Sequence, residues 1–146
     1  MPQVNRLLLQ EKADAVSRCI QRISSKKPAT QDLLLTDIDA QDIITLNLER
    51  SVQACVDIAA HIIAYSPLPA AVTMADSFSV LCNCKIISKD LSDRMRKAVG
   101  LRNLLVHEYQ TINWDIVWSV LTAHLSDPLD FVKTVLDWSA KVPAGS

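Results

Sequence analysis

Residues 40–65, AQDIITLNLERSVQACVDIAAHIIAY, carry the longest regular apolar pattern in the chain. The apolar side chains recur every three or four residues, at Ile43, Ile44, Leu48, Val52, Cys55, Val56, Ala59, Ile62 and Ile63. This spacing puts them on one face of an α-helix, whereas a strand would need strict alternation. Pro67 and Pro69 follow and cannot continue a helix. The stretch therefore predicts a long, half-buried helix from Ala40 to about Tyr65.

Similar patterns on both sides of this stretch predict further helices. They run from Val4 to about Lys26, from Thr73 to Cys82, from a cap at Ser88 to near Glu108 and onward from a cap at Asn113. The last runs to about Lys141 and begins at Asp127, which resembles a cap with Pro128 at the first helical position. Between Pro28 and residue 40 we expect a polar loop, with Thr36 and Asp39 as candidate caps. No strand pattern or internal repeat is visible. We predict an all-α helix bundle of five or six helices in one domain, residues 1–141, with a flexible tail at 142–146.

The composition is that of a globular protein, with 49% hydrophobic residues, 21% charged residues and two glycines in 146 residues. No apolar run is long enough for a membrane span and no signal pattern opens the chain, so we expect a cytoplasmic protein. The four cysteines are scattered over apolar stretches, which favours reduced thiols. Cys82-x-Cys84 lacks the second ligand pair of a structural zinc site, and no phosphate-binding loop is present. We expect no metal and no cofactor.

The net charge of −1 does not suggest nucleic-acid binding, but the charge is unevenly distributed. Residues 85–102 hold six cationic and two acidic residues, a local balance of +4 that leaves −5 for the rest of the chain. One interpretation is an ordinary solvated helix face. The other is a surface that binds the RNA backbone, through Lys85, Lys89, Arg94, Arg96 and Lys97.

Residues 100–109, GLRNLLVHEY, bring four reactive side chains together on an otherwise apolar segment: Arg102, Asn103, His107 and Tyr109. On a continuous helix Asn103 and His107 are neighbours, and Arg102 lies about 140° around the axis from His107, a gap that its long stem can close. Cleavage of RNA without a metal needs a group that exchanges a proton near neutral pH and a cation for the developing phosphorane charge.

His107 fits the proton-transfer task and Arg102 fits the charge-stabilising task. Asn103 would orient the imidazole, and Tyr109 would place a hydroxyl at the edge of the site. From spacing alone, a surface arginine and a helix-end histidine are the commoner explanation of this pattern. His61 and His124 fit packing roles, and Asp57 lies one turn from His61, where a structural hydrogen bond is the expected arrangement.

The motif Arg102-x4-His107-x-Tyr109 resembles that of the HepT-like toxins of the HEPN superfamily. The resemblance extends over most of the chain, through Glu49–Gln53, Asp57–Ile62, Ser77–Leu81, Ile86–Ser88 and Arg94–Leu101.

The resemblance implies an all-α homodimer with the two motifs facing one cleft, acting as a metal-independent endoribonuclease on RNA. It also implies a partner, a minimal nucleotidyltransferase antitoxin similar to MntA, which would inactivate the toxin by transferring AMP to Tyr109. An alternative is a non-catalytic helical module that only docks the nucleotidyltransferase, and a third is a degenerate scaffold that merely dimerises.

Overall fold

The computed structural model describes residues 4–108 and 111–142, and this part of the chain contains seven α-helices. They are α1 (Arg6–Lys26), α2 (Gln31–Thr36), α3 (Ile38–Ala64), α4 (Met74–Asn83), α5 (Lys89–His107), α6 (Trp114–Ala123) and α7 (Ser126–Lys141). The all-α architecture is as predicted, but the count of five or six helices is wrong. None of the described helices is long and apolar enough to cross a membrane.

The additional helix is α2, which lies where we expected a polar loop. The hydroxyl of Thr30 accepts a hydrogen bond from the Leu33 amide and begins the helix, and Leu34 is fully buried. The cap of α3 is Asp37, which accepts from the Ala40 amide, and not the predicted Thr36 or Asp39. A six-residue helix is too short to show an apolar period, so its sequence resembles a loop.

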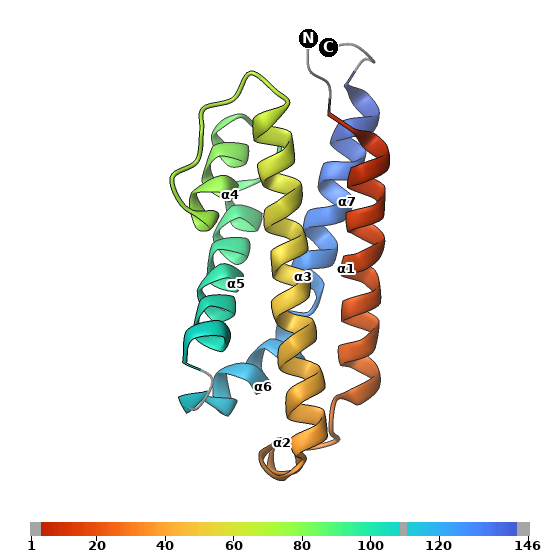
Figure 1. The fold of residues 1–146 in the computed structure, drawn as a ribbon, viewed down its shortest axis with the longest axis vertical. Helices are drawn as coiled ribbons and strands as arrows, with labels where there is room; N and C mark the ends of the chain where they lie inside the picture. The colour runs from red at the N-terminus through yellow and green to blue at the C-terminus, as the bar shows by residue number, and fades with distance from the viewer. Residues whose placement is uncertain (1–3, 109–110, 143–146) are drawn as a thin grey trace.

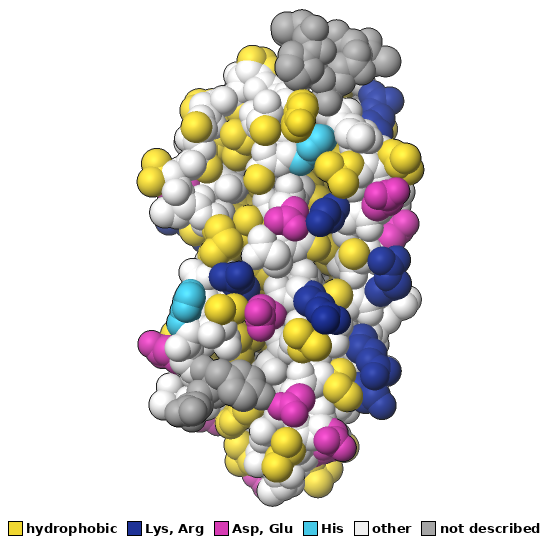
Figure 2. All heavy atoms as spheres, viewed as in Figure 1, with side chains coloured by type: hydrophobic (Ala, Val, Ile, Leu, Met, Phe, Trp, Pro, Cys, Tyr) yellow, Lys and Arg dark blue, Asp and Glu magenta, His cyan; other side chains and the backbone are white. Residues whose placement is uncertain are grey.

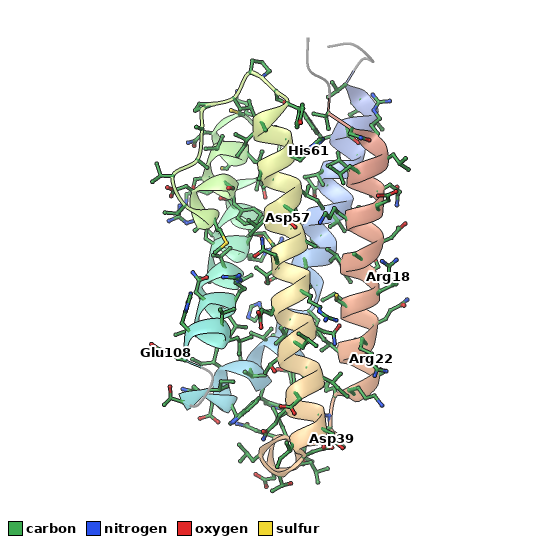
Figure 3. All side chains as sticks on the ribbon, in the orientation of Figure 1. Arg18, Arg22, Asp39, Asp57, His61 and Glu108 are labelled. Atoms are coloured by element: carbon green, nitrogen blue, oxygen red, sulfur yellow. The ribbon has the colours of Figure 1, made fainter. Side chains whose placement is uncertain are left out.

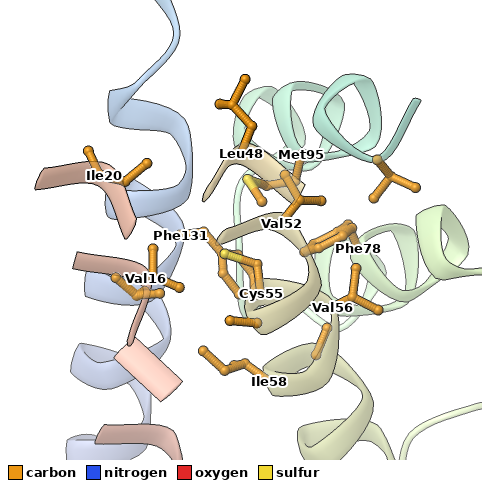
Figure 4. Packing of buried hydrophobic residues seen from close by; sticks show 14 of the residues in the cluster. Val16, Ile20, Leu48, Val52, Cys55, Val56, Ile58, Phe78, Met95 and Phe131 are labelled. Atoms are coloured by element: carbon orange, nitrogen blue, oxygen red, sulfur yellow. The ribbon is translucent and has the colours of Figure 1, made fainter. Parts of the chain in front are cut away.

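Helix α3 occupies the centre of the bundle (Figure 1). It packs against α1 and α7 on one side and against α4 and α5 on the other, while α2 and α6 meet at one end. Buried side chains of α1, including Val16, face Cys55 and its neighbours on α3 (Figure 4). Phe78 and Phe131 meet edge to face in this core, with ring centroids 5.1 Å apart.

Helix α5, which carries the motif, begins as predicted: Ser88 caps it and accepts from the Leu91 amide at 3.1 Å. The loop before it, after α4, turns in the left-handed region at Lys85, with φ of 63°. The amides of Lys85 and Ile86 bond back to the carbonyls of Cys82 and Leu81, which closes the end of α4. These contacts end α4, and the local cap at Ser88 begins α5.

Arg94 ties α5 to α7. Its Nη1 lies 2.8 Å from Asp127 and 2.9 Å from Asp130, and its Nε donates to Asp90 at 3.0 Å. The expectation that Asp127 caps the last helix is wrong, because α7 begins one residue earlier and its start has no side-chain cap. Pro128 sits in the first turn, where a missing amide costs little.

Candidate active site

Helix α5 carries three of the four motif residues on its last two turns and ends at His107. The helix remains regular to this point, since the Glu108 amide still bonds to the Leu104 carbonyl at 2.9 Å. Tyr109 lies outside the described residues. The helical spacing assumed for Arg102, Asn103 and His107 therefore holds in the structure.

The guanidinium of Arg102 is half-buried and only partly satisfied. Its Nη1 donates to the side-chain oxygen of Asn103 at 3.1 Å. Its Nε is buried and has no hydrogen-bond partner in the described part of the chain. A buried donor without an acceptor costs about 1–3 kcal/mol, and more when the group is charged. Asn103 therefore holds the Arg102 guanidinium in place, and the guanidinium keeps hydrogen-bond donors for an anion.

His107 is exposed, and no hydrogen bond joins it to Arg102 or Asn103 in the described structure. The expected contact between Asn103 and the imidazole is thus not made, because the Asn103 oxygen accepts from Arg102 instead. The structure brings Arg102 and Asn103 together and leaves His107 facing solvent at the end of the same helix.

The surface around His107 is unusually apolar for an exposed helix. Leu104 is 44% exposed and Val106 is 37% exposed. A Cβ atom added at Gly100 would meet nothing within 4 Å. Gly100, Leu104 and His107 are spaced by four and three residues and share a face of α5. This face can receive another chain at close range, because the glycine adds no side-chain bulk.

The fold neutralises part of the cationic segment of residues 85–102. Lys89 pairs with Asp93 at 3.1 Å, and Arg94 contacts three carboxylates, which hold its pKa above the ordinary value, chiefly through Asp127. Arg96 donates to the Ser79 hydroxyl. Lys85 and Lys97 are exposed and form no ion pair with a described residue. The expectation of an RNA contact at Arg94 does not fit this geometry, because its charge is already compensated.

A second cationic surface lies between α1 and α3 and was not singled out in the sequence. Arg18 and Arg22 from α1 and Arg50 from α3 line a groove of about 500 Å³. Figure 3 shows Arg18 and Arg22 along one edge of the face on which Glu108, the neighbour of His107, marks the other edge. Arg18 and Arg22 belong to a cationic stretch of α1, but Arg50 comes from α3, so the sequence alone does not show that the three arginines share one groove.

The other histidines have structural partners. The Nε2 atom of His61 accepts from the Asn5 amide at 2.9 Å, and burial lowers the pKa of this imidazole. The predicted hydrogen bond between Asp57 and His61 does not form, since Asp57 pairs with Lys12 at 3.1 Å and accepts from Gln53. His124 lies 3.3 Å from Asp127. Among the described residues no group of three or more His, Cys, Asp or Glu side chains is placed to hold a metal ion.

Comparisons with known proteins agree with the resemblance found in the sequence. The profile of the HepT-like ribonucleases matches residues 13–135. The chain is 39% identical over 124 residues to the mRNA nuclease HepT of Shewanella oneidensis, covering 85% of this chain and 92% of that protein. It is 23% identical over 135 residues to the tRNA nuclease HepT of Aphanizomenon flos-aquae, covering 92% of each.

Among solved structures, the chain is similar to the tri-AMPylated HEPN toxin of Shewanella oneidensis in complex with MNT antitoxin. The TM-score is 0.82 at 38% sequence identity, and the match covers 88% of this chain and 96% of that one. The family profile, the 39% identical relative and the shared fold agree with one another. The chain therefore belongs to the HepT-like ribonuclease family of HEPN toxins.

Proposed function

We propose that this protein is the toxin of a toxin-antitoxin pair and cleaves RNA internally, without a metal ion, at Arg102 and His107. The observation that carries the proposal is the buried, unpartnered Nε of Arg102, five residues before an exposed histidine. Relatives described as an mRNA nuclease and a tRNA nuclease support the substrate class. Cytoplasmic RNA would be the substrate.

In the proposed reaction the ribose 2′-hydroxyl attacks the adjacent phosphorus and the bond to the 5′-oxygen breaks. The products are a 2′,3′-cyclic phosphate and a 5′-hydroxyl end. His107 takes the proton from the 2′-hydroxyl or gives one to the leaving oxygen. Arg102 would supply the cation for the phosphate oxygens, where charge-assisted hydrogen bonds from its guanidinium stabilise the transition state. Asn103 holds the guanidinium from the other side, through its 3.1 Å contact.

The active form is proposed to be a homodimer that buries the exposed face of α5. Gly100 and Leu104 give that face its open space and apolar character. A second copy packed there would exclude water beside His107 and bring two motifs to one cleft. Because electrostatic interactions strengthen as water leaves, the dimer would raise the effect of Arg102 on phosphate charge.

Regulation is proposed to act at Tyr109, two residues beyond His107. A nucleotidyltransferase antitoxin similar to MntA would pass AMP to the tyrosine: the phenol oxygen attacks the α-phosphorus of ATP and pyrophosphate leaves. The AMP phosphate would compete with RNA for Arg102, and the nucleoside would fill the cleft. The AMPylated Shewanella toxin in complex with its antitoxin supports this regulation.

The test compares His107→Ala with His124→Ala, a second exposed histidine outside the motif. We expect His107→Ala to lower the cleavage rate by about 10²–10⁴-fold with an unchanged circular dichroism spectrum, because general acid–base catalysis contributes that much. His124→Ala should keep its activity. Wild-type cleavage should persist in chelator and stop when the scissile nucleotide lacks its 2′-hydroxyl. A wild-type protein that binds the nucleotidyltransferase and never cleaves RNA would instead support the non-catalytic docking module.

A further inference from the structure

The groove between α1 and α3 presents a regular array of cationic side chains. Arg18 and Arg22 are four residues apart and share a face of α1, with about 5–6 Å between their Cβ atoms. Arg50 approaches from the opposite wall, on α3. Cys19 lies between the walls, and its thiol pKa, raised by burial, is lowered in part by the charges of Arg50 and Arg18. Arginines from two different helices thus line the same groove.

These charges are available to a ligand. Within the described residues none of Arg18, Arg22 and Arg50 forms an ion pair. In contrast, Lys12, nearer the N-terminal end of α1, is paired with Asp57 of α3 at 3.1 Å. Keeping three unpaired cations together on a chain of net charge −1 costs repulsion, which an anionic ligand would relieve.

The geometry points to the phosphate backbone of single-stranded RNA as this ligand: we propose that the α1–α3 groove is an RNA-binding site apart from the catalytic motif. This inference rests on the proposed function for the identity of the ligand. Forked guanidinium groups bind phosphate oxygens in pairs, and successive arginines can hold successive phosphates. Leu46, 43% exposed on the α3 wall, offers an apolar surface to a base or ribose.

The position of the groove fits a strand that continues from the catalytic motif. Helix α3 packs on both α5 and α1 and so bridges the motif and the groove. On the face seen in Figure 2, Lys and Arg side chains occur at the α5 edge, over α3 and along α1. An RNA strand cleaved beside α5 can therefore cross α3 and reach Arg50 and then Arg22 without leaving this face.

The test removes one arginine from each wall, in the variant Arg22→Gln/Arg50→Gln. The charge-matched control is Lys133→Gln/Lys141→Gln, two exposed lysines of α7 outside the groove. Binding of a fluorescent single-stranded RNA of about 30 nucleotides is measured against salt, with all proteins in a His107→Ala background that preserves the RNA. Losing two phosphate contacts should reduce the salt slope by about 1.4 and weaken binding about 25-fold at 0.1 M salt.

Cleavage of a dinucleotide, too short to reach the groove, is measured in parallel with His107 intact. The proposal expects this rate to be unchanged in the groove variant and the melting temperature to match that of the control. Equal RNA affinity and salt slope in the groove and control variants would overturn it. Unchanged RNA binding with lost binding to the antitoxin would also overturn it, and would make the groove a protein-docking surface. If wild type cleaves neither substrate but the groove variant still loses RNA affinity, the proposed function fails and the groove inference stands.

Discussion

Replacing Arg94 by leucine separates two roles for this residue, an RNA contact and an internal ion pair between α5 and α7. In the structure its Nη1 lies 2.8 Å from Asp127 and 2.9 Å from Asp130. Arg94→Leu removes the charge and keeps an apolar stem of similar reach. If the ion pair is what matters, the variant loses stability even with no RNA present.

The expected magnitude follows from the exposure of each carboxylate. Asp90 is 80% exposed and Asp130 is 49% exposed, so both are rehydrated when Arg94 is removed and contribute little. The Asp127 side chain is 9% exposed and is left as a nearly buried charge. Breaking a buried pair costs about 3–5 kcal/mol. Because His124 still lies 3.3 Å from Asp127, we expect the lower end, about 3 kcal/mol, or a fall in Tm of about 6–12 °C.

The assay is urea and thermal unfolding followed by circular dichroism. Arg96→Leu is the control, an exposed arginine two residues away on the same helix. The double variant Arg94→Leu/Asp127→Leu should recover most of the loss, since it leaves no buried charge. A stable Arg94→Leu protein with weakened RNA binding would refute this reasoning and restore Arg94 as an RNA contact.

Three further predictions concern other local features. Lys85→Gly should raise the free energy of unfolding by about 1 kcal/mol in urea titrations, because a φ of 63° strains a lysine and not a glycine; a loss would contradict the assigned turn. Burial lowers the pKa of His61, so the unfolded chain binds the proton more readily and stability falls as the pH drops below about 6.5. His61→Gln should flatten that dependence of Tm, and an unchanged pH profile would show that the burial of His61 is not its source. Burial also raises the pKa of Cys55, which is 0% exposed, so a thiol reagent should modify it only after unfolding, whereas early modification would mean that the core opens readily.

The helices that the sequence predicted well are those whose limits are set by adjacent residues. Ser88 and Asn113 cap α5 and α6 as expected, because a cap is a contact made within three residues. Pro28 and Pro67 lie beyond helix ends for an equally local reason. The prediction failed at Asp127, which has a capping sequence but pairs with Arg94, 33 residues away. A sequence pattern within a few residues cannot show whether a carboxylate will cap its own helix or pair with a side chain that is distant in the sequence.

The same limit applies to the candidate site. The motif residues were recognisable because they follow one another on a helix, and Arg102 and His107 are at the expected helical positions. The partner of Asn103 was not predictable, since an amide on this helix can reach either Arg102 or His107. The structure places it 3.1 Å from Arg102, which changes its proposed role from orienting the imidazole to holding the guanidinium.

The positive charge that an RNA strand can contact depends on which cations remain unpaired, and this depends on which helices pack together. The segment of residues 85–102 has a local charge balance of +4, yet Lys89 and Arg94 pair with carboxylates of α5 and α7. The α1–α3 groove draws its arginines from distant positions, and packing leaves them unpaired. An RNA strand is attracted by the field that remains after such pairs have formed. From the motif on α5, its path over this protein should therefore follow α3 toward Arg50 and the unpaired arginines of α1.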